Sequence, residues 1–475
     1  TWAASLDVAG TWQMELYRRK DEAAFSGGLG DREFGHWWKV LQPGESFSAP
    51  RAWVTVTDQP VPRAWDRLLE SFGEESGPAS EEACPVIFNE WCTSWGSPTH
   101  KNLIELADRL RGSGVKHLVI DDGWAERPAD ALLQSNGDWI VNKTAFPEGL
   151  EGTVRELRER EIDPGIWFEF EVVNPGSAAW SETSHLLHRD GQVLQVGSRR
   201  FWDFRDPWVH EYLGEKVVAL LRSNGFRYLK VDYNDTIGLG VDGAESPGEG
   251  LRQHLEGVVG FFQKLRNELP DLVIENCSSG GHRHSAPFLR TCAMSSFSDA
   301  HESVDIPIIT ANLLPVVPKQ KLQVWAVLRK SDNARRLHYS LAATFLGRMC
   351  LSGDLHELST EQWATTQRAI GFYRELAPTF TQGTCQRHGP VLSSYNYPEG
   401  WQAVVRTAGD ECIVIAHTFA NAPKRIEIPC PKGNWQISGI FAEQPEKFLT
   451  EADQFVWDCA GDFAGIVARF YKSGC

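Results

Sequence analysis

The chain has 475 residues, a formal net charge of -16 and 42% hydrophobic residues. This length predicts one large catalytic domain of roughly 250 to 300 residues with smaller attachments. An acidic chain without blocks of Lys or Arg is unsuited to nucleic acid or an anionic membrane surface, because both bind a basic face. No apolar run approaches the roughly 20 residues of a membrane-spanning helix, so we expect no membrane partner.

The ten cysteines form no C-x-x-C pair and no regular framework. This pattern is typical of buried free thiols in a reducing compartment. The chain begins with Thr1, and no charged segment followed by an apolar one indicates a signal peptide. We therefore expect a cytoplasmic location. Without a P-loop or a G-x-G-x-x-G after a strand, we also expect no nucleotide cofactor and no other cofactor.

Residues 1–82 predict a partial β domain followed by a linker. Apolar and polar residues alternate over 11–16 and 52–56, as in strands with one buried face. Residues 73–82 are rich in Gly, Glu and Ser, which favours a surface linker. The β segment is too short for a closed sandwich, so it is interpreted as the last strands of one.

Short apolar runs alternate with amphipathic helices from Pro85 onward, a rhythm typical of βα units on a parallel sheet. The segment 201–204 interrupts the rhythm and is interpreted as a loop element. Eight such units predict a TIM (β/α)8 barrel over residues 83–358. The eight runs are 86–91, 117–120, 165–170, 228–232, 272–277, 294–298, 322–328 and 349–353.

Helices are predicted between these runs, for example over 102–111, 209–221 and 251–269. Residues 359–475 begin with a helix over 360–376 and continue with alternating strands that predict a C-terminal antiparallel β domain. The predicted strands there are 403–405, 412–415 and 426–428. The predicted fold class is therefore α/β, a barrel flanked by two β regions.

Polar side chains end six successive barrel runs, at the edge where TIM barrels carry their functional groups. One such carboxylate is usually a helix cap, but six need another explanation. Hydroxyl-rich sugars require many fixed acceptors, and glycosidic cleavage requires two carboxyl groups beside the bond. The array thus favours sugar chemistry. Its members are Asn89, Glu90, Asp121, Asp122, Glu169, Glu171, Asp232, Asn234, Glu275, Asn276 and Asp299.

A metal-dependent barrel hydrolase is the alternative from a different enzyme class. It would use His282, His284 and His301, but the first two form a weak i, i+2 pair without an obvious third ligand. We expect no metal site.

The motifs, taken in order, resemble the melibiase-like α-galactosidases of glycoside hydrolase family 36, in the clan that also holds families 27 and 31. The resemblance covers residues 43–299. It rests on Pro-Gly-Glu-Ser-Phe at 43–47, Asp-Asp-Gly-Trp at 121–124, Gly-Ile-Trp-Phe-Glu-Phe-Glu at 165–171, Lys-x-Asp-x-Asn at 230–234, Glu-Asn-Cys-Ser-Ser-Gly-Gly at 275–281 and Ser-Asp at 298–299.

This resemblance implies a retaining enzyme that hydrolyses terminal α-galactosyl residues of oligosaccharides. Asp232 would be the nucleophile and Asp299 the general acid/base. Retaining enzymes hold these two carboxyl groups about 5 to 5.5 Å apart. A structural reading of Asp232 as a buried partner of Lys230 is compatible, because alternate residues of a strand share a face.

The resemblance also implies sugar-binding residues. Asp121 and Asp122 would bind the 4- and 6-hydroxyls, and Cys277 and Gly280 would lie near the 2-hydroxyl. Lys230 and Asn234 would bind sugar and support the nucleophile.

Trp124 and Trp167 would line the pocket. Core packing is the alternative for both tryptophans, a helix cap for Asp122 and a core thiol for Cys277.

Several positions depart from the family pattern, so other functions stay open. Val231 and Tyr233 stand where the family has Trp and Met, residues 282–285 replace Gly-Arg-Phe-Asp, and 300–302 also differ. An α-N-acetylgalactosaminidase, another clan D α-glycosidase or transglycosidase, and an inactive carbohydrate-binding protein are the alternatives. The resemblance implies an N-terminal β sandwich of which only the last strands are present, and members often form tetramers, which leaves a homo-oligomer open.

Overall fold

The computed structural model describes residues 1–59, 61–72, 77–127, 135–451, 453–458 and 461–472. The chain divides into two compact units that are interleaved in sequence. The first unit comprises 1–78, 122–154 and 167–293, and the second comprises 79–121, 155–166 and 294–475.

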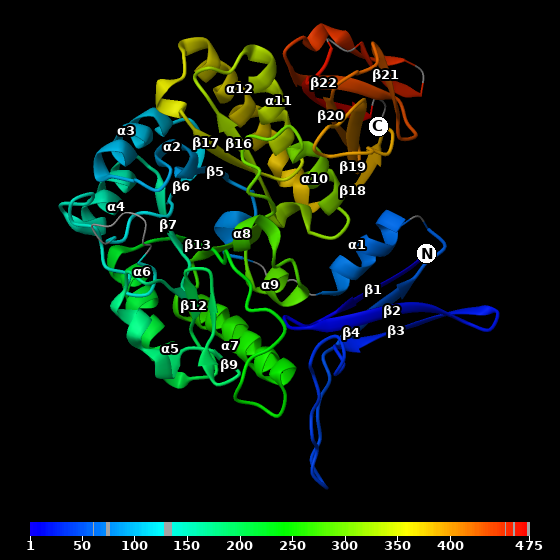
Figure 1. The fold of residues 1–475 in the computed structure, drawn as a ribbon. Coiled ribbons are helices and arrows are strands. Elements are labelled where there is room, and N and C mark those ends of the chain that lie inside the picture. The colour runs from blue at the N-terminus through cyan, green and yellow to red at the C-terminus, as the bar shows by residue number, and fades with distance from the viewer. Residues whose placement is uncertain (60, 73–76, 128–134, 452, 459–460, 473–475) are drawn as a thin grey trace. The chain divides into compact units, whose positions relative to one another are not determined.

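Parallel strands close into a barrel (Figure 1). All eight predicted runs are its strands, so the prediction of a TIM barrel is confirmed. Their continuous apolar sequences fit strands buried on both faces, as in a parallel sheet covered by helices. The strands are β5 (Val86–Asn89), β6 (Val115–Ile120), β7 (Asp163–Phe168), β13 (Tyr228–Val231), β14 (Val273–Asn276), β15 (Met294–Ser296), β16 (Leu322–Leu328) and β17 (Arg348–Gly353).

Amphipathic helices connect the strands. Helix α3 (His100–Leu110) begins at a capping box on Thr99, and α7 (Pro247–Glu268) begins at Ser246, whose hydroxyl accepts the N–H of Glu249. The helix predicted over 209–221 is divided by a π turn at 214–218. The remaining helices around the barrel include α4 (Gly149–Glu159), α5 (Pro207–Leu213), α6 (Ala219–Asn224), α9 (Ala286–Thr291), α10 (Ile306–Leu313), α11 (Ala334–Thr344) and α12 (Thr360–Leu376).

The segment predicted as a loop element begins in β12 (Arg199–Phe201), which lies outside the barrel. It forms a small antiparallel sheet with β8 (Val172–Val173) and β11 (Gln195–Val196). This sheet belongs to the connection between β7 and β13. Through it, Arg199 reaches Glu169, which directly follows β7.

The N-terminal residues form two strand pairs. Strand β1 (Trp2–Leu6) pairs with β4 (Ala52–Val56), and β2 (Trp12–Arg19) pairs with β3 (Glu22–Leu29). Strands β2 and β4 match the two predicted strands. Helix α1 (Val61–Ser71), which the sequence analysis did not predict, packs Ala64 and Leu68 against Ala3.

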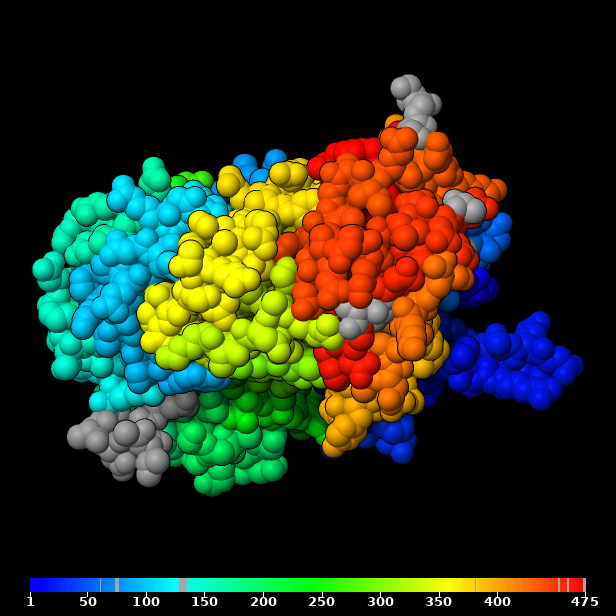
Figure 2. All heavy atoms as spheres, turned by 90° about the horizontal axis from the view of Figure 1, so that it is seen from above, coloured from blue at the N-terminus to red at the C-terminus, as the bar shows by residue number. Residues whose placement is uncertain are grey.

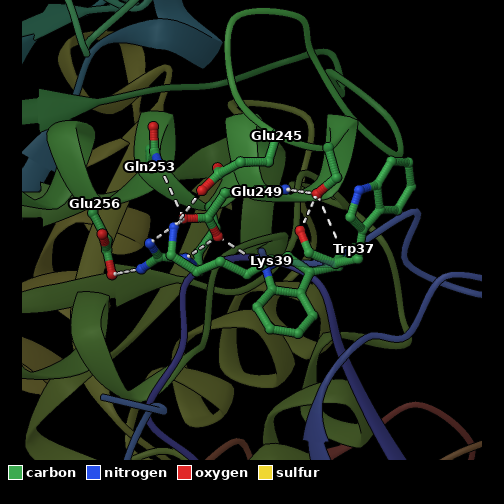
Figure 3. Close-up of polar contacts among 9 residues, drawn as sticks. Trp37, Lys39, Glu245, Glu249, Gln253 and Glu256 are labelled. Carbon is green, nitrogen blue, oxygen red and sulfur yellow. Dashed lines mark hydrogen bonds and ion pairs between the residues drawn. The ribbon is translucent and has the colours of Figure 1, made fainter. Parts of the chain in front are cut away.

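The chain after β3 is anchored to α7 of the same unit through Glu249 (Figure 3). The Glu249 carboxylate is fully buried and accepts hydrogen bonds from Trp37 Nε1 (2.9 Å), Lys39 Nζ (3.1 Å) and Arg252 (2.7 Å). Gly248 allows the backbones to approach, because an added Cβ would lie 2.4 Å from the carbonyl oxygen of Gly35.

The predicted surface linker over 73–82 is wrong at its end. Residues 73–76 lie outside the described part of the chain, and Glu81 is buried in a short 3-10 turn. Its carboxylate pairs with Arg348 and lies 3.0 Å from Nε2 of His117. A buried charge needs such partners, because an unpaired one is strongly disfavoured.

The C-terminal region forms two antiparallel sheets, as predicted, and Figure 2 shows it in orange and red. The larger sheet has the order β18-β19-β20-β25-β22 and the smaller β21-β24-β23. One core packs residues of both sheets, including Val414, Ile428 and Phe455. The strands are β18 (Thr384–His388), β19 (Trp401–Ala408), β20 (Glu411–Thr418), β21 (Arg425–Pro429), β22 (Trp435–Ala442), β23 (Phe448–Glu451), β24 (Gln454–Asp458) and β25 (Gly465–Lys472).

Among the described residues, no helix is both long and apolar enough to cross a bilayer.

Candidate active site

The Asp232 carboxylate lies directly after β13, in the first unit, and is 9% exposed. Its Oδ1 accepts backbone N–H groups from Ser279 (2.8 Å) and Tyr233 (2.9 Å). Its Oδ2 accepts Nδ2 of Asn234 (2.9 Å) and Nε1 of Trp167 (3.2 Å). Donors directed at both oxygens hold the carboxyl in one orientation and favour its charged form.

The charge of Asp232 is set by two opposing effects. Burial raises its pKa, whereas the positive charge of Lys230, followed by the N–H donors, lowers it, and the net result is a pKa below the ordinary value. Lys230 is itself 4% exposed and precedes Asp232 by two residues on the same face. Asp232 is therefore ionised at neutral pH, which is the state a nucleophile requires.

A left-handed turn follows β14 and supplies one of these donors. Residues 278 to 281 have φ values of 50°, 53°, 68° and 115°. Non-glycine residues avoid this region, and such strain persists where surrounding contacts impose it. Here Ser278 Oγ donates to Oδ1 of Asn276 (2.8 Å), and Nδ2 of Asn276 donates to the carbonyl oxygen of Arg283 (2.7 Å). The turn thereby directs the Ser279 N–H at the Asp232 carboxylate.

Two predicted sugar-binding residues belong to this turn or adjoin it. Cys277 is 2% exposed, and its N–H donates to the carbonyl oxygen of Val231 (2.8 Å). Gly280 is half-buried, and its φ of 68° is one that glycine adopts readily because it has no side chain. The structure therefore brings both residues next to the Asp232 strand.

A second buried carboxylate supports Asn234 from behind. Glu169, directly after β7, accepts the backbone N–H of Asn234 (2.8 Å), Nδ2 of Asn136 (3.0 Å) and Nε of Arg199 (3.1 Å). Burial raises the pKa of Glu169 to about 8, with Arg199 opposing this and Asp232 adding to it. No recognised sequence motif contains Arg199, so its place in the site could not be predicted from the sequence.

The segment that departs from the family pattern is fixed by an ion pair. Arg283 forms a bidentate pair with Glu171 (2.6 and 2.7 Å), and its guanidinium lies 3.7 Å from the Tyr233 ring centroid. His284 is half-buried with both ring nitrogens shielded from solvent, and burial lowers its pKa to about 4, so it is neutral at pH 7.

The two tryptophans predicted to line the pocket have different positions. Trp167 contacts Asp232 directly. Trp124 is 0% exposed, donates Nε1 to the carbonyl oxygen of Trp167 (2.8 Å) and packs against Phe168 and Trp139. Trp124 thus holds the Trp167 backbone and offers no surface to a sugar, which differs from the sequence prediction.

The two aspartates predicted to bind the 4- and 6-hydroxyls are adjacent in sequence but lie in different units. In the second unit, Asp121 is 3% exposed, accepts Nδ2 of Asn89 (2.6 Å) and donates its N–H to Oε1 of Glu90 (3.0 Å). In the first unit, Asp122 pairs with Arg127 (2.8 Å).

The predicted acid/base, Asp299, follows β15 in the second unit. Its side chain is 49% exposed, and Oδ1 lies 3.8 Å from Nε2 of His301. The His301 ring packs 4.8 Å from Trp325, which donates to Gln323. A solvent-accessible carboxyl suits a group that exchanges protons with a leaving oxygen and with water. The separation of Asp299 from Asp232 stays a prediction.

Within the described residues, no group of three or more His, Cys, Asp or Glu is arranged to hold a metal ion. The three histidines of the metal-dependent alternative are therefore not gathered into a ligand set there.

The family model described as Melibiase matches residues 46–383, which is more than half of the chain. The chain belongs to the Melibiase family. The resemblance to family 36 α-galactosidases that the motifs predicted is confirmed.

Two curated relatives extend this finding to the C-terminal region. Alpha-galactosidase AgaA of Geobacillus stearothermophilus is 24% identical over 438 residues, which is 87% of this Melibiase-family chain and 58% of AgaA. Alpha-galactosidase Mel36A of Lactobacillus acidophilus is 24% identical over 416 residues, covering 83% of this chain and 54% of Mel36A. The chain thus spans little more than half the length of these relatives.

The fold is also that of solved family 36 structures. A variant of the Geobacillus AgaA in complex with raffinose superposes with a TM-score of 0.85 at 20% identity, covering 99% of this chain and 67% of that one. At this identity the likeness shows the fold alone.

Proposed function

We propose that this Melibiase-family chain is a retaining α-galactosidase that removes terminal α-galactosyl residues from oligosaccharides. The observation that carries the proposal is the Asp232 carboxylate, which is ionised, buried and oriented by four N–H donors at the end of β13. The relatives named α-galactosidases and the complex of AgaA with raffinose support galactosides as the substrate class.

The reaction has two displacements at the anomeric carbon. Asp232 attacks this carbon, the bond to the leaving oxygen breaks, and Asp299 donates its proton to that oxygen. Asp299, now a carboxylate, takes a proton from water as the water oxygen attacks the galactosyl ester. The ester bond breaks, Asp232 leaves as the carboxylate, and the product retains the α configuration.

The sugar-binding residues carry over to the same proposal. Trp167 and Lys230, each beside Asp232, would contact the galactosyl ring, and Cys277 and Gly280 would lie near its 2-hydroxyl. Buried carboxylates such as Asp121 can accept hydrogen bonds from sugar hydroxyls. Asp122 would accept such a bond in place of its present bond from Arg127.

The test is a panel of p-nitrophenyl α-glycosides (galactoside, N-acetylgalactosaminide, glucoside and arabinoside) with the wild type, Asp232→Ala and Asp299→Ala. We expect cleavage of the galactoside and loss in both variants. Added azide distinguishes the roles: it replaces the missing nucleophile in Asp232→Ala and gives the β-azide, whereas in Asp299→Ala it replaces water and gives the α-azide.

The control is Asp108→Ala, because Asp108 is 60% exposed on α3 and pairs with Arg160. It should retain activity. A folded wild type that cleaves no galactoside, or that releases β-galactose first, would overturn the proposal. Preference for the N-acetylgalactosaminide would replace the sugar but keep the mechanism.

A further inference from the structure

Trp95 is a large aromatic residue that is 54% exposed, and it ends the short helix that follows the first barrel strand. Strand β5 leads through Glu90 into helix α2 (Trp91–Ser94), and Trp95 ends that helix with φ 51° and ψ 49°. Bulky residues rarely adopt this left-handed conformation. Neither the motifs nor the proposed mechanism uses Trp95.

The Trp95 ring is held in place although half of it faces solvent. The Trp91 ring packs against it nearly edge-on, with centroids 5.8 Å apart, and the guanidinium of Arg329 lies 5.7 Å from its centroid. Arg329 is itself fixed by Asp354 (3.0 Å) and the carbonyl oxygen of Cys92 (2.7 Å). A fixed aromatic surface loses little conformational entropy when it binds a ligand.

The same arginine connects Trp95 with the acid/base loop. Arg329 pairs with Glu302, three residues beyond Asp299. Glu302 follows β15, Arg329 follows β16 and Asp354 follows β17, so all three belong to the carboxyl-terminal edge of the barrel. All of these residues lie in the second unit.

We propose that Trp95 is the stacking platform for the leaving sugar, the part of the oligosaccharide whose oxygen Asp299 protonates. This inference rests on the proposed function. The leaving sugar must lie beside Asp299, because the acid/base protonates the oxygen of that sugar. Trp95 offers the apolar face that a pyranose ring stacks on, one side chain away from the Asp299 loop.

The test compares a donor that has a leaving sugar with one that has none. Raffinose and α-galactosyl fluoride are assayed with the wild type, Trp95→Ala and Trp95→Phe. We expect Trp95→Ala to lower kcat/KM for raffinose about tenfold, through KM, and to leave the fluoride unchanged. Trp95→Phe should recover most of the loss, because it keeps a ring.

Trp12→Ala is the matched control, since Trp12 is 55% exposed on strand β2, and it should leave both donors unchanged. Equal loss on both donors with Trp95→Ala would show a structural role and overturn the inference. Unchanged raffinose kinetics would overturn it as well. Failure of the proposed function has a different signature, because the wild type would then turn over neither donor.

Discussion

The backbone N–H of Ser279 donates to Oδ1 of Asp232 at 2.8 Å, from a residue whose φ is 53°. A hydrogen bond to the proposed nucleophile is thus made by a strained segment of chain. Its geometry depends on the residues that hold the turn, in particular Asn276 and the two glycines that follow Ser279.

The two glycines of this turn should respond differently to alanine. Gly280 has φ 68° and ψ 53°, a region that other residues enter at a cost of about 1 to 2 kcal/mol. Gly281 has φ 115°, a conformation that residues with a side chain rarely adopt. We expect Gly281→Ala to lower both the melting temperature and kcat/KM for p-nitrophenyl α-galactoside more than Gly280→Ala. Equal melting temperatures for the two variants would contradict this reading of the turn.

Asn234→Ala should change the pH profile of the reaction. The substitution removes the 2.9 Å hydrogen bond to Oδ2 of Asp232 and keeps the backbone N–H that binds Glu169. Loss of a donor to the charged form raises the Asp232 pKa. Because protonated Asp232 cannot attack, the acid limb of kcat/KM should move to higher pH, and the maximum should fall about tenfold, as for loss of a bond to a charged group.

The control for Asn234→Ala is Asn224→Ala, which removes a bond from Nδ2 to the Leu220 carbonyl oxygen at the end of α6. Its pH profile should match that of the wild type. If the acid limb of Asn234→Ala did not move, Asp232 would not be the group that limits activity at low pH.

The barrel and the strand-end carboxylates could be predicted because both leave local patterns. Each strand is a short apolar run, and each functional group comes within a few residues of its end. Asp232 and Asn234 illustrate this, since one residue separates them in the sequence and one hydrogen bond joins them.

The contacts that could not be predicted join residues far apart in the chain. Glu169 and Arg199 are 30 residues apart, and Glu81 and Arg348 are 267 apart. Composition predicted an exposed linker at Glu81, because an acidic residue among Gly and Ser is usually solvated. A buried partner overrides that tendency at Glu81. Trp124 is a similar case, because core packing places it away from the pocket surface that its motif predicted.

Glu81→Gln should therefore destabilise the protein at neutral pH. The substitution leaves the guanidinium of Arg348, which is 1% exposed, without its charged partner. Removing one member of a buried pair costs about 3 to 5 kcal/mol. The free energy of unfolding, measured in urea, should fall by this order. The adjacent Glu82 is exposed, so Glu82→Gln is the matched control and should leave stability unchanged.

The same pair predicts how stability depends on pH. Burial alone would raise the pKa of Glu81, but Arg348 and His117 lower it to about 2, below its ordinary value of 4.5. A lowered pKa in the folded state adds stability that is fully present above pH 4.5 and is lost as pH falls towards 2. The stability difference between wild type and Glu81→Gln should shrink over that window. A constant difference would assign the effect to packing instead.

Glu249→Gln should release the segment that leads from β3 to β4. Burial alone would raise the pKa of Glu249, but the hydrogen bonds from Arg252, Trp37, Gln253 and Lys39 outweigh this effect, and the net pKa lies below its ordinary value. A charged carboxylate therefore anchors Trp37 and Lys39 (Figure 3). Two backbone amides report on this anchor: the Trp38 N–H donates to Ser246 Oγ (3.1 Å) and the Gly248 N–H to the His36 carbonyl oxygen (3.0 Å). Hydrogen exchange at both amides should accelerate at least tenfold in Glu249→Gln.

The matched control is Glu256→Gln on the same helix. Glu256 is 62% exposed and pairs with Arg252, so its loss should leave exchange at Trp38 and Gly248 unchanged. Gly248→Ala reaches the same contact by a different route, because its Cβ would press on the Gly35 carbonyl oxygen. It should accelerate exchange at Trp38 while leaving the Glu249 charge intact. If Glu249→Gln left both amides protected, the close backbone approach at Gly248, and not the buried charge, would be what holds the segment on α7.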